Sequence, residues 1–523
     1  MTRPIRLALG GLILASMLAC SLPAAVISPP PPAITLVTVG PDATSTPTPF
    51  QPAVVDLPLP TDTPFPTETP TDLPTLTFTA PAPSATQPAP GGSDTPAPAS
   101  TNRTQYLFYA ELDYANRTLS ASETVRYYNT TGQALSEIVM AVPPNLSNAF
   151  SLNSLSQDQN PLTDYSLVGE RMSIILPSAL APEAVTTFNI SFSLSIPPKH
   201  YEGTFGYSGD QVNLTDWYPF IVPFDNGWVL HDPWSFGEHL VYDSSDFELN
   251  LKVNDPTVSI AASAPAEANG EWTRYRIYGA RTIVFSASGS YLVSESAVGN
   301  TAIRIYYFAG YEGAGDGLLR AALSAVGLFD AKFGPYPYDS LSVVQTDVPD
   351  GQEFDGLVFL GTKFYAEYGG SARSNLITIG VHEISHQWWF GLVGNDQAME
   401  PWLDEALAIY SENTFYTYNF PRYGDWWWGF RVNYFGPSGW VDTSIYDHGT
   451  FRSYVNAAYL NGANFLYELN QRMGDDAFYS FLRDYVSRYS RRRATTADFF
   501  AVLRADSDVR IDDLISTYFQ RSY

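Results

Sequence analysis

Between residues 103 and 300, hydrophobic positions alternate with polar ones, which is the pattern of strands that bury one face. The clearest case runs from Thr187 to Ile196, and the segment from Asp246 to Val253 repeats it. Asn, Gly, Asp and Pro residues divide the region into short pieces. The pattern predicts an amino-terminal, antiparallel, β-sandwich-like domain. Its expected buried positions are Phe188, Ile190, Phe192, Leu194, Ile196, Phe247, Leu249, Leu251 and Val253.

The pattern becomes mixed from about residue 301 onward. A strand is predicted from Ile303 to Phe308, an amphipathic helix from Leu318 to Phe333 and a further strand around Leu341 to Asp347. Two more helices are expected around residues 381–412. The fold class is therefore predicted as α+β multidomain, with a β domain over 103–300 and a catalytic domain over 301–523.

Metal-binding chemistry is indicated by the spacing of two histidines. His382 and His386 lie four positions apart, so on a helix both imidazoles project from one face. Glu383 comes directly after the first histidine, where its carboxylate can take a proton from water beside a metal ion. The third ligand is predicted to be Glu405, nineteen positions after His386 on a second helix. Two imidazoles and a carboxylate are the donors of a catalytic zinc site.

The competing interpretation of the histidine pair is two structural histidines in a hydrophobic core. Glu405 at the expected downstream distance makes this interpretation much less probable, because a structural histidine pair does not require a glutamate at that position. The other ring nitrogen of each metal-binding imidazole needs an acceptor, and Asp396, Glu400 and Asp404 are the candidates. The remaining histidines, His200, His231, His239 and His448, are expected to be structural or exposed.

The segments HEISHQWW and WLDEALAIYSE resemble the aminopeptidase N and leukotriene hydrolase family of zinc gluzincin metallopeptidases. The resemblance implies a thermolysin-like catalytic domain after the β domain. It also implies a short, bacterial-type member, because about 60 residues come after Tyr459 and the large carboxy-terminal helical domain of many members would be absent. A more open substrate cleft is then expected.

Two further segments extend the resemblance. DGQEFDGLVFL, from Asp350 to Leu360, occupies the place of the family's Gly-x-Met-Glu-Asn strand, with Gln352 and Phe354 replacing Met and Asn. The resemblance implies that Glu353 binds the free amino terminus of a substrate. The plainer alternative for Glu353 is a solvated loop carboxylate.

The segment from Tyr459 to Phe500 resembles the family's Tyr-x-Lys-Gly-Ala segment and the two helices after it, with Asn461 in place of Lys. The resemblance makes Tyr459 the catalytic residue whose hydroxyl donates to the developing oxyanion. Tyr454 and Tyr467 lie nearby, and tyrosine is abundant, so a packing role is the alternative. Only the flanking Gly462 and Ala463 single out Tyr459.

The first 102 residues predict where the protein acts. Arg3 and Arg6 precede a short apolar run from Leu7 to Leu18, which is typical of a secretory signal peptide over residues 1–20. Cys20, the only cysteine, resembles the lipidated cysteine of bacterial lipoproteins, although an ordinary cleaved signal is the alternative. Residues 21–102 are rich in Pro and Thr and predict a disordered, extended linker. We expect export and a lipid anchor at the outer face of the bacterial membrane.

A formal net charge of −26 argues against nucleic acid as a partner and against direct binding to an anionic membrane surface. We expect a zinc-dependent aminopeptidase that hydrolyses amino-terminal residues of extracellular peptides with zinc-activated water. The alternatives are a zinc endopeptidase or an epoxide hydrolase on the same scaffold, or a non-catalytic zinc-containing surface protein. The sequence leaves the oligomeric state and the preferred side chain open.

Overall fold

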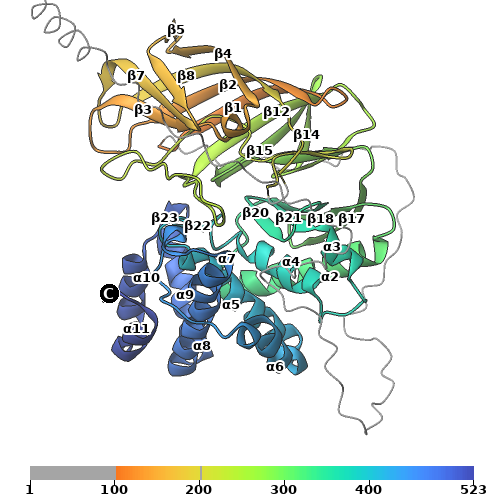
Figure 1. Ribbon diagram of the computed structural model, residues 1–523, viewed down its shortest axis with the longest axis vertical. Coiled ribbons are helices and arrows are strands. Elements are labelled where there is room, and N and C mark those ends of the chain that lie inside the picture. The colour runs from red at the N-terminus through yellow and green to blue at the C-terminus, as the bar shows by residue number, and fades with distance from the viewer. Residues whose placement is uncertain (1–101, 201–202) are drawn as a thin grey trace, which may run out of the picture. The chain divides into compact units, whose positions relative to one another are not determined.

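The computed structural model describes residues 102–200 and 203–523, which belong to one compact unit (Figure 1). The predictions for the signal peptide, Cys20 and almost all of the proline-rich linker lie outside the described residues. Within the described part, no helix has the length and apolar character needed to span a bilayer.

The first described region is built from strands, as expected from the alternating pattern. An eight-stranded sheet has the order β14-β15-β12-β1-β2-β8-β4-β5. Its strands are β1 (Gln105–Asp113), β2 (Thr118–Tyr128), β4 (Phe150–Gln157), β5 (Asn160–Pro161), β8 (Val185–Ser195), β12 (Ser245–Val253), β14 (Ala266–Asn269) and β15 (Trp272–Ala280). Along β8 every second side chain is buried, and apart from Thr186 these are the predicted apolar positions from Phe188 to Leu194.

Two four-stranded sheets accompany the large sheet, with orders β11-β3-β7-β6 and β13-β16-β10-β9. The first comprises β3 (Leu135–Ala141), β6 (Tyr165–Val168), β7 (Arg171–Leu180) and β11 (Phe220–Ile221). The second comprises β9 (Gly206–Ser208), β10 (Gln211–Leu214), β13 (Ser259–Ala262) and β16 (Phe285–Ser288). Buried aromatic rings join these layers, and Trp217 contacts both Phe108 and Phe285.

One strand departs from the antiparallel expectation. β12 pairs antiparallel with β15 but parallel with β1. Its polar residues Asp246 and Asn250 are buried as well as its apolar ones, so it is not a half-buried strand, and Val253 at its end is only partly buried. The pairing with β1 joins segments that are far apart in the sequence, and a local pattern contains no information on such a partner.

A five-stranded mixed sheet of order β17-β18-β19-β21-β20 opens the second region. Its strands are β17 (Leu292–Val298), β18 (Thr301–Tyr307), β19 (Ser340–Thr346), β20 (Gly351–Phe354) and β21 (Leu357–Gly361). The expected boundary at residue 300 falls between β17 and β18, which pair with each other, so this sheet begins at Leu292. The division into domains remains a prediction. β20, which carries Glu353, lies at the sheet edge.

Helices pack against this sheet and carry the candidate site; α2 lies between β18 and β19 in the chain, and the other helices come after β21 (Figure 1). α4 packs against α2, α5 and β20, and α5 packs against α8 and the segment η6. The helices are α2 (Glu312–Phe333), α3 (Thr362–Ala366), α4 (Asn375–Ser385), α5 (Trp402–Asn419), α6 (Gly424–Trp427), α7 (Phe451–Tyr454), η6 (Val455–Asn461), α8 (Gly462–Met473), α9 (Asp475–Tyr489), α10 (Thr496–Asp506) and α11 (Asp512–Tyr518). Their apolar faces form one continuous core with the sheet.

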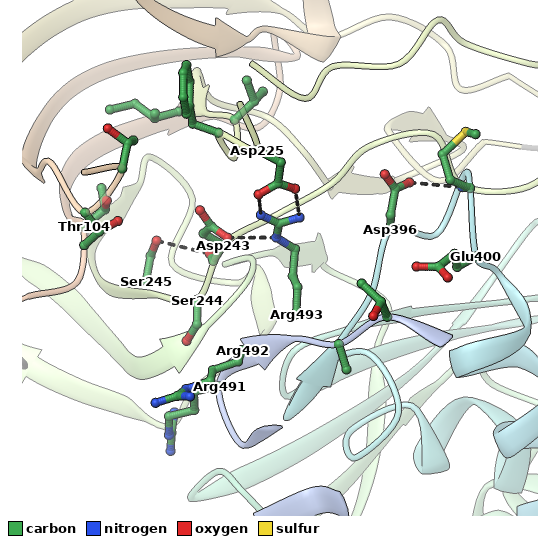
Figure 2. A pocket seen from close by; sticks show the side chains of 18 of the residues that line it. Thr104, Asp225, Asp243, Ser244, Ser245, Asp396, Glu400, Arg491, Arg492 and Arg493 are labelled. Carbon is green, nitrogen blue, oxygen red and sulfur yellow. Dashed lines mark hydrogen bonds and ion pairs between the residues drawn. The ribbon is translucent and has the colours of Figure 1, made fainter. Parts of the chain in front are cut away.

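Arginines connect the two regions. Arg493, in the short strand β23 (Arg492–Arg493), forms a bidentate ion pair with Asp225 at 2.6 and 2.8 Å and donates to Asp243 at 3.0 Å (Figure 2). Buried Arg281 donates to the carbonyl oxygens of Tyr242 and Arg492. A polar cavity of about 1450 Å³ lies beside Arg493, and none of the predicted metal ligands lines it. This cavity is therefore separate from the candidate active site.

Candidate active site

The first two predicted ligands lie at the carboxyl end of α4. The helix begins after Ser374, whose hydroxyl accepts a hydrogen bond from the backbone N–H of Ile377. His386 is the residue directly after the last turn, and it keeps helical backbone angles, so its imidazole projects on the same side as that of His382. The two Nε2 atoms lie 3.2 Å apart, and both side chains are buried.

Glu405 comes from the first turn of α5, as predicted from the sequence. Its Oε2 lies 3.2 Å from Nε2 of His382 and 3.6 Å from Nε2 of His386. Ligands bound tetrahedrally to zinc at the usual distances lie about 3.3 Å from one another. The three donors therefore have the spacing that zinc requires.

The protonation of the histidines also fits a metal. Burial, the dominant effect, lowers the pKa of His386 to about 4, so its imidazole is neutral. Its Nδ1 hydrogen-bonds the carbonyl oxygen of Trp389 at 2.8 Å, which leaves the lone pair of Nε2 directed at the shared point. For His382, burial opposes the charged form, but hydrogen bonds to Glu405 and Glu412 raise its pKa to about 10. A bound cation would take the place of that proton.

The acceptor that orients His382 is Glu412, which was not among the residues predicted from the sequence. Its Oε1 lies 2.9 Å from Nδ1 of His382, and buried Arg431 donates to both of its carboxylate oxygens at 2.7 to 3.1 Å. Glu412 lies seven residues after Glu405, two helical turns further along the same face of α5. This seven-residue spacing is the sequence signal that could have identified Glu412.

The three acceptors expected from the sequence are not the ones that orient the imidazoles. Asp396 lies 2.8 Å from the ring of His231, Glu400 accepts from the backbone N–H of Thr496, and Asp404 accepts from the backbone N–H of Glu405. These residues are near the histidines in sequence, but the fold gives each of them another partner. The other histidines expected to be structural include His239, which pairs with Glu170, and His448, which contacts Thr443.

Glu383, the predicted general base, is buried beside the metal triad. Burial raises the pKa of its carboxyl well above the usual range, and the charge of His382 opposes this shift. Gly351 of β20 lies against it, and a Cβ at that position would stand 2.2 Å from Oε1 of Glu383. A glycine is therefore needed where the edge strand passes the base.

In addition to Glu383, two carboxylates rather than one lie beside the triad. Glu353 is buried at the edge of the sheet and accepts from Nε2 of Gln397 at 3.0 Å. Half-buried Glu238 joins it, since Glu238, Glu353 and Glu405 each present a carboxylate oxygen within 4.8 Å of the others. Burial, and then the charge of Glu405, raises the pKa of Glu238 to about 8. Such a cluster favours a cation between its members.

Glu238, in the segment GEHLVY, was not predicted as a site residue. No local spacing links Glu238 to the helices, so only the fold brings it there. Glu353, by contrast, lies beside the triad as predicted and is not a solvated loop carboxylate.

Tyr459 lies in η6, a π-helical segment. Such segments occur mostly as short insertions at functional sites. The ring of Tyr459 stacks parallel to that of His382 with centroids 6.5 Å apart, and its hydroxyl hydrogen-bonds Glu405. Burial, and after it the charge of Glu405, raises the pKa of the phenol well above its usual range, so the hydroxyl keeps its proton for donation. Tyr467 is exposed and packs on Trp428 instead.

Known proteins share this fold and part of this sequence. Residues 335–518 match the Peptidase family M1 domain. "Aminopeptidase M1-B" of Oryza sativa subsp. japonica is 26% identical over 243 residues, which are 43% of this chain and 28% of that protein. "Endoplasmic reticulum aminopeptidase 1" of Homo sapiens is 25% identical over 236 residues, 42% of this chain and 25% of that protein. The chain thus spans about a quarter of the length of these relatives.

A solved structure of a mutant M1 zinc metallopeptidase from Deinococcus radiodurans has a TM-score of 0.60 to this chain. It is 17% identical, and the match covers 81% of this chain and 95% of the other. At this level of identity the likeness concerns the fold, which is α+β and multidomain as predicted.

The fold is that of solved M1 zinc metallopeptidases, and the donor set is that of a catalytic zinc site. The match of residues 335–518 to the M1 peptidase domain supports the resemblance to the aminopeptidase N family of gluzincins. The metal that the His382, His386 and Glu405 group fits is zinc.

Proposed function

We propose that the protein is an aminopeptidase that removes amino-terminal residues from peptides. The observation that carries this proposal is the pair of carboxylates, Glu353 and Glu238, beside the metal triad. Burial raises the pKa of both groups, and the charges of neighbouring carboxylates add to the shift, so a substrate ammonium placed between them would relieve this repulsion. An ammonium at that point places the first peptide bond of the substrate at the triad.

Each side chain of the site then has a defined task. Zinc, when held by His382, His386 and Glu405, supplies a Lewis acid and lowers the pKa of water to about 7. Glu383 takes the proton of the attacking water and delivers it to the leaving amine. Tyr459 donates its hydroxyl hydrogen to the oxygen on which negative charge develops. Glu412, held by Arg431, fixes the ring of His382.

The altered Gly-x-Met-Glu-Asn segment does not weaken the proposal. The carboxamide oxygen of Gln352 accepts from the hydroxyl of Thr204 at 2.7 Å, and Phe354 is buried in a small cluster with Phe359. Phe354 therefore packs between the sheets. Gln352 links β20 to the preceding β region through its hydrogen bond with Thr204.

The proposal is tested with a peptide that carries either a free or an acetylated amino terminus. Acetylation should lower kcat/KM roughly 100-fold, since a charged group with hydrogen-bonded partners contributes about 3 kcal/mol. Glu353→Gln should lower activity on the free peptide and leave the low activity on the acetylated one unchanged. Equal cleavage of both peptides by the unaltered protein would make it an endopeptidase instead.

We also propose that the enzyme acts outside the cell, anchored by a lipid on Cys20. The apolar run from Leu7 to Leu18 and the proline-rich stretch after it support this proposal. In a bacterial host, the full-length protein should partition into the membrane fraction, and Cys20→Ala should release it. A Cys20→Ala protein that stays in the membrane fraction would exclude a lipid on Cys20 as the anchor.

A further inference from the structure

Regular secondary structure does little to fix the two proposed amine-binding carboxylates. Glu238 lies within residues 229–244, which form neither helix nor strand. Glu353 lies in β20, a four-residue strand that pairs with β21 on one side only. A binding group must be held in place to be effective, because a displacement of about 1 Å already weakens its action. The positions of both carboxylates therefore depend on side-chain contacts with other segments.

One turn, residues 395–400, supplies such a contact to each carboxylate. It lies between β22 (Val393–Gly394) and α5. Nε2 of buried Gln397 donates to Oε1 of Glu353 at 3.0 Å. The two carboxylate oxygens of the adjacent Asp396 lie 2.8 and 3.0 Å from Nε2 of His231, which must be the donor because a carboxylate only accepts. His231 precedes Glu238 in the same irregular segment, so one turn contacts the supports of both carboxylates.

A second contact ties the segment of Glu238 to the same turn. Gly237, directly before Glu238, has a φ of +74°, and a Cβ there would stand 2.7 Å from Cγ2 of Ile445. The backbone N–H of Ile445 donates to the carbonyl oxygen of Ala398 at 2.9 Å. The turn therefore holds this segment directly at His231 and, through Ile445, immediately beside Glu238.

The turn is itself fixed by hydrogen bonds. Asp396 accepts from the backbone N–H of Met399 at 3.0 Å, and Gln397 also hydrogen-bonds the buried carboxyl of Asp404, next to the metal-binding Glu405. The polar cavity of about 1450 Å³ borders the turn at Asp396 and Met399 (Figure 2). Where the turn faces this cavity, hydrogen bonds rather than close packing set its position.

We propose that the turn of residues 395–400 positions both amine-binding carboxylates, with Gln397 acting through Glu353 and His231, held by Asp396, acting through Glu238. The inference rests on the proposed aminopeptidase function, because it assigns the substrate ammonium to these two carboxylates. Gln397, Asp396 and His231 are positioning residues. Loss of either contact lets one carboxylate move away from the ammonium and leaves the metal triad and Glu383 in place.

The test uses the full-length, zinc-loaded protein with alanine p-nitroanilide and its N-acetyl derivative. Gln397→Met keeps nearly the same side-chain volume and removes the donor to Glu353, and His231→Leu removes the donor to Asp396. Each should raise KM for the free amine about 10-fold with little change in kcat, since the ammonium is bound in the ground state and the transition state alike. Cleavage of the acetylated substrate should not change. His231→Gln, which keeps an N–H donor, should restore most of the affinity.

Double substitutions test which carboxylate each residue acts through. Added to Glu353→Gln, Gln397→Met should cause no further loss, whereas added to Glu238→Gln it should cause its full 10-fold loss. His231→Leu should behave in the opposite way. A merely structural role would give the full loss in both backgrounds. The matched control is Gln471→Met, which alters an exposed side chain on α8 and should leave KM unchanged.

The outcomes separate this inference from the proposed function. If the unaltered protein cleaves the free and acetylated substrates equally, the aminopeptidase function and this inference both fail. If it requires the free amine, but Gln397→Met or His231→Leu leaves KM unchanged or adds its full loss to that of its own carboxylate, the positioning role is wrong and the function stands. The side chains of His231 and Asp396 are 22% and 20% exposed, so His231→Leu leaves the core intact and decides the question if Gln397→Met does not fold.

Discussion

Replacing Glu383 by Gln is expected to lower kcat about 1000-fold, which corresponds to about 4 kcal/mol of lost transition-state stabilisation. The substitution keeps the shape of the side chain and removes its ability to take a proton from water. Because Glu383 is not one of the three donors of the triad, zinc content should stay the same. The measurement is kcat on alanine p-nitroanilide together with metal analysis of the purified protein.

The matched control for this prediction is Glu367→Gln, which alters an exposed carboxylate after α3 and should leave kcat unchanged. A Glu383→Gln protein with normal kcat would refute the proposed mechanism, because another group would then have to accept the proton. Loss of zinc together with activity would instead show that Glu383 acts on the metal site itself.

Replacing Tyr459 by Phe is expected to lower kcat about 100-fold with little change in KM, because one donor to a developing oxyanion contributes about 3 kcal/mol. The ring would still stack on His382, so the packing of the site should be preserved. A loss that appears only in kcat identifies an interaction made in the transition state. Steady-state kinetics with the p-nitroanilide provide both constants.

Tyr467→Phe is the control for Tyr459, since Tyr467 is 40% exposed and lies on Trp428 away from the metal triad. It should leave both constants unchanged. A Tyr459→Phe protein with normal kcat would assign Tyr459 to packing, which was the competing interpretation of this residue from the sequence.

The residues that share one helix or one strand could be predicted from the sequence. The positions of His382, Glu383 and His386 result from helical periodicity, and the buried face of β8 results from strand alternation. Glu405 also lies where predicted, because α5 presents its first turn to α4. Glu353 and Tyr459 were placed through the family resemblance, and the fold brings both to the triad.

Contacts between distant segments could not be predicted from the sequence. Glu238 reaches the triad from a segment more than 100 residues upstream of Glu353, and nothing in its neighbourhood marks it as a site residue. Asp396, Glu400 and Asp404 were expected to orient the histidines but face other partners. The parallel pairing of β12 with β1 is another contact between distant segments that the sequence pattern did not predict.

The amino-acid sequence by itself determined which residues are the candidate metal ligands and the candidate general base, and the order of the β and helical regions, because periodicity places side chains that are close in the chain on one face. Tertiary structure decided that Glu238 joins Glu353 beside the triad, and that Glu412 and Arg431 hold His382. Burial and charge at these positions depend on packing between segments that the chain brings together only when it folds.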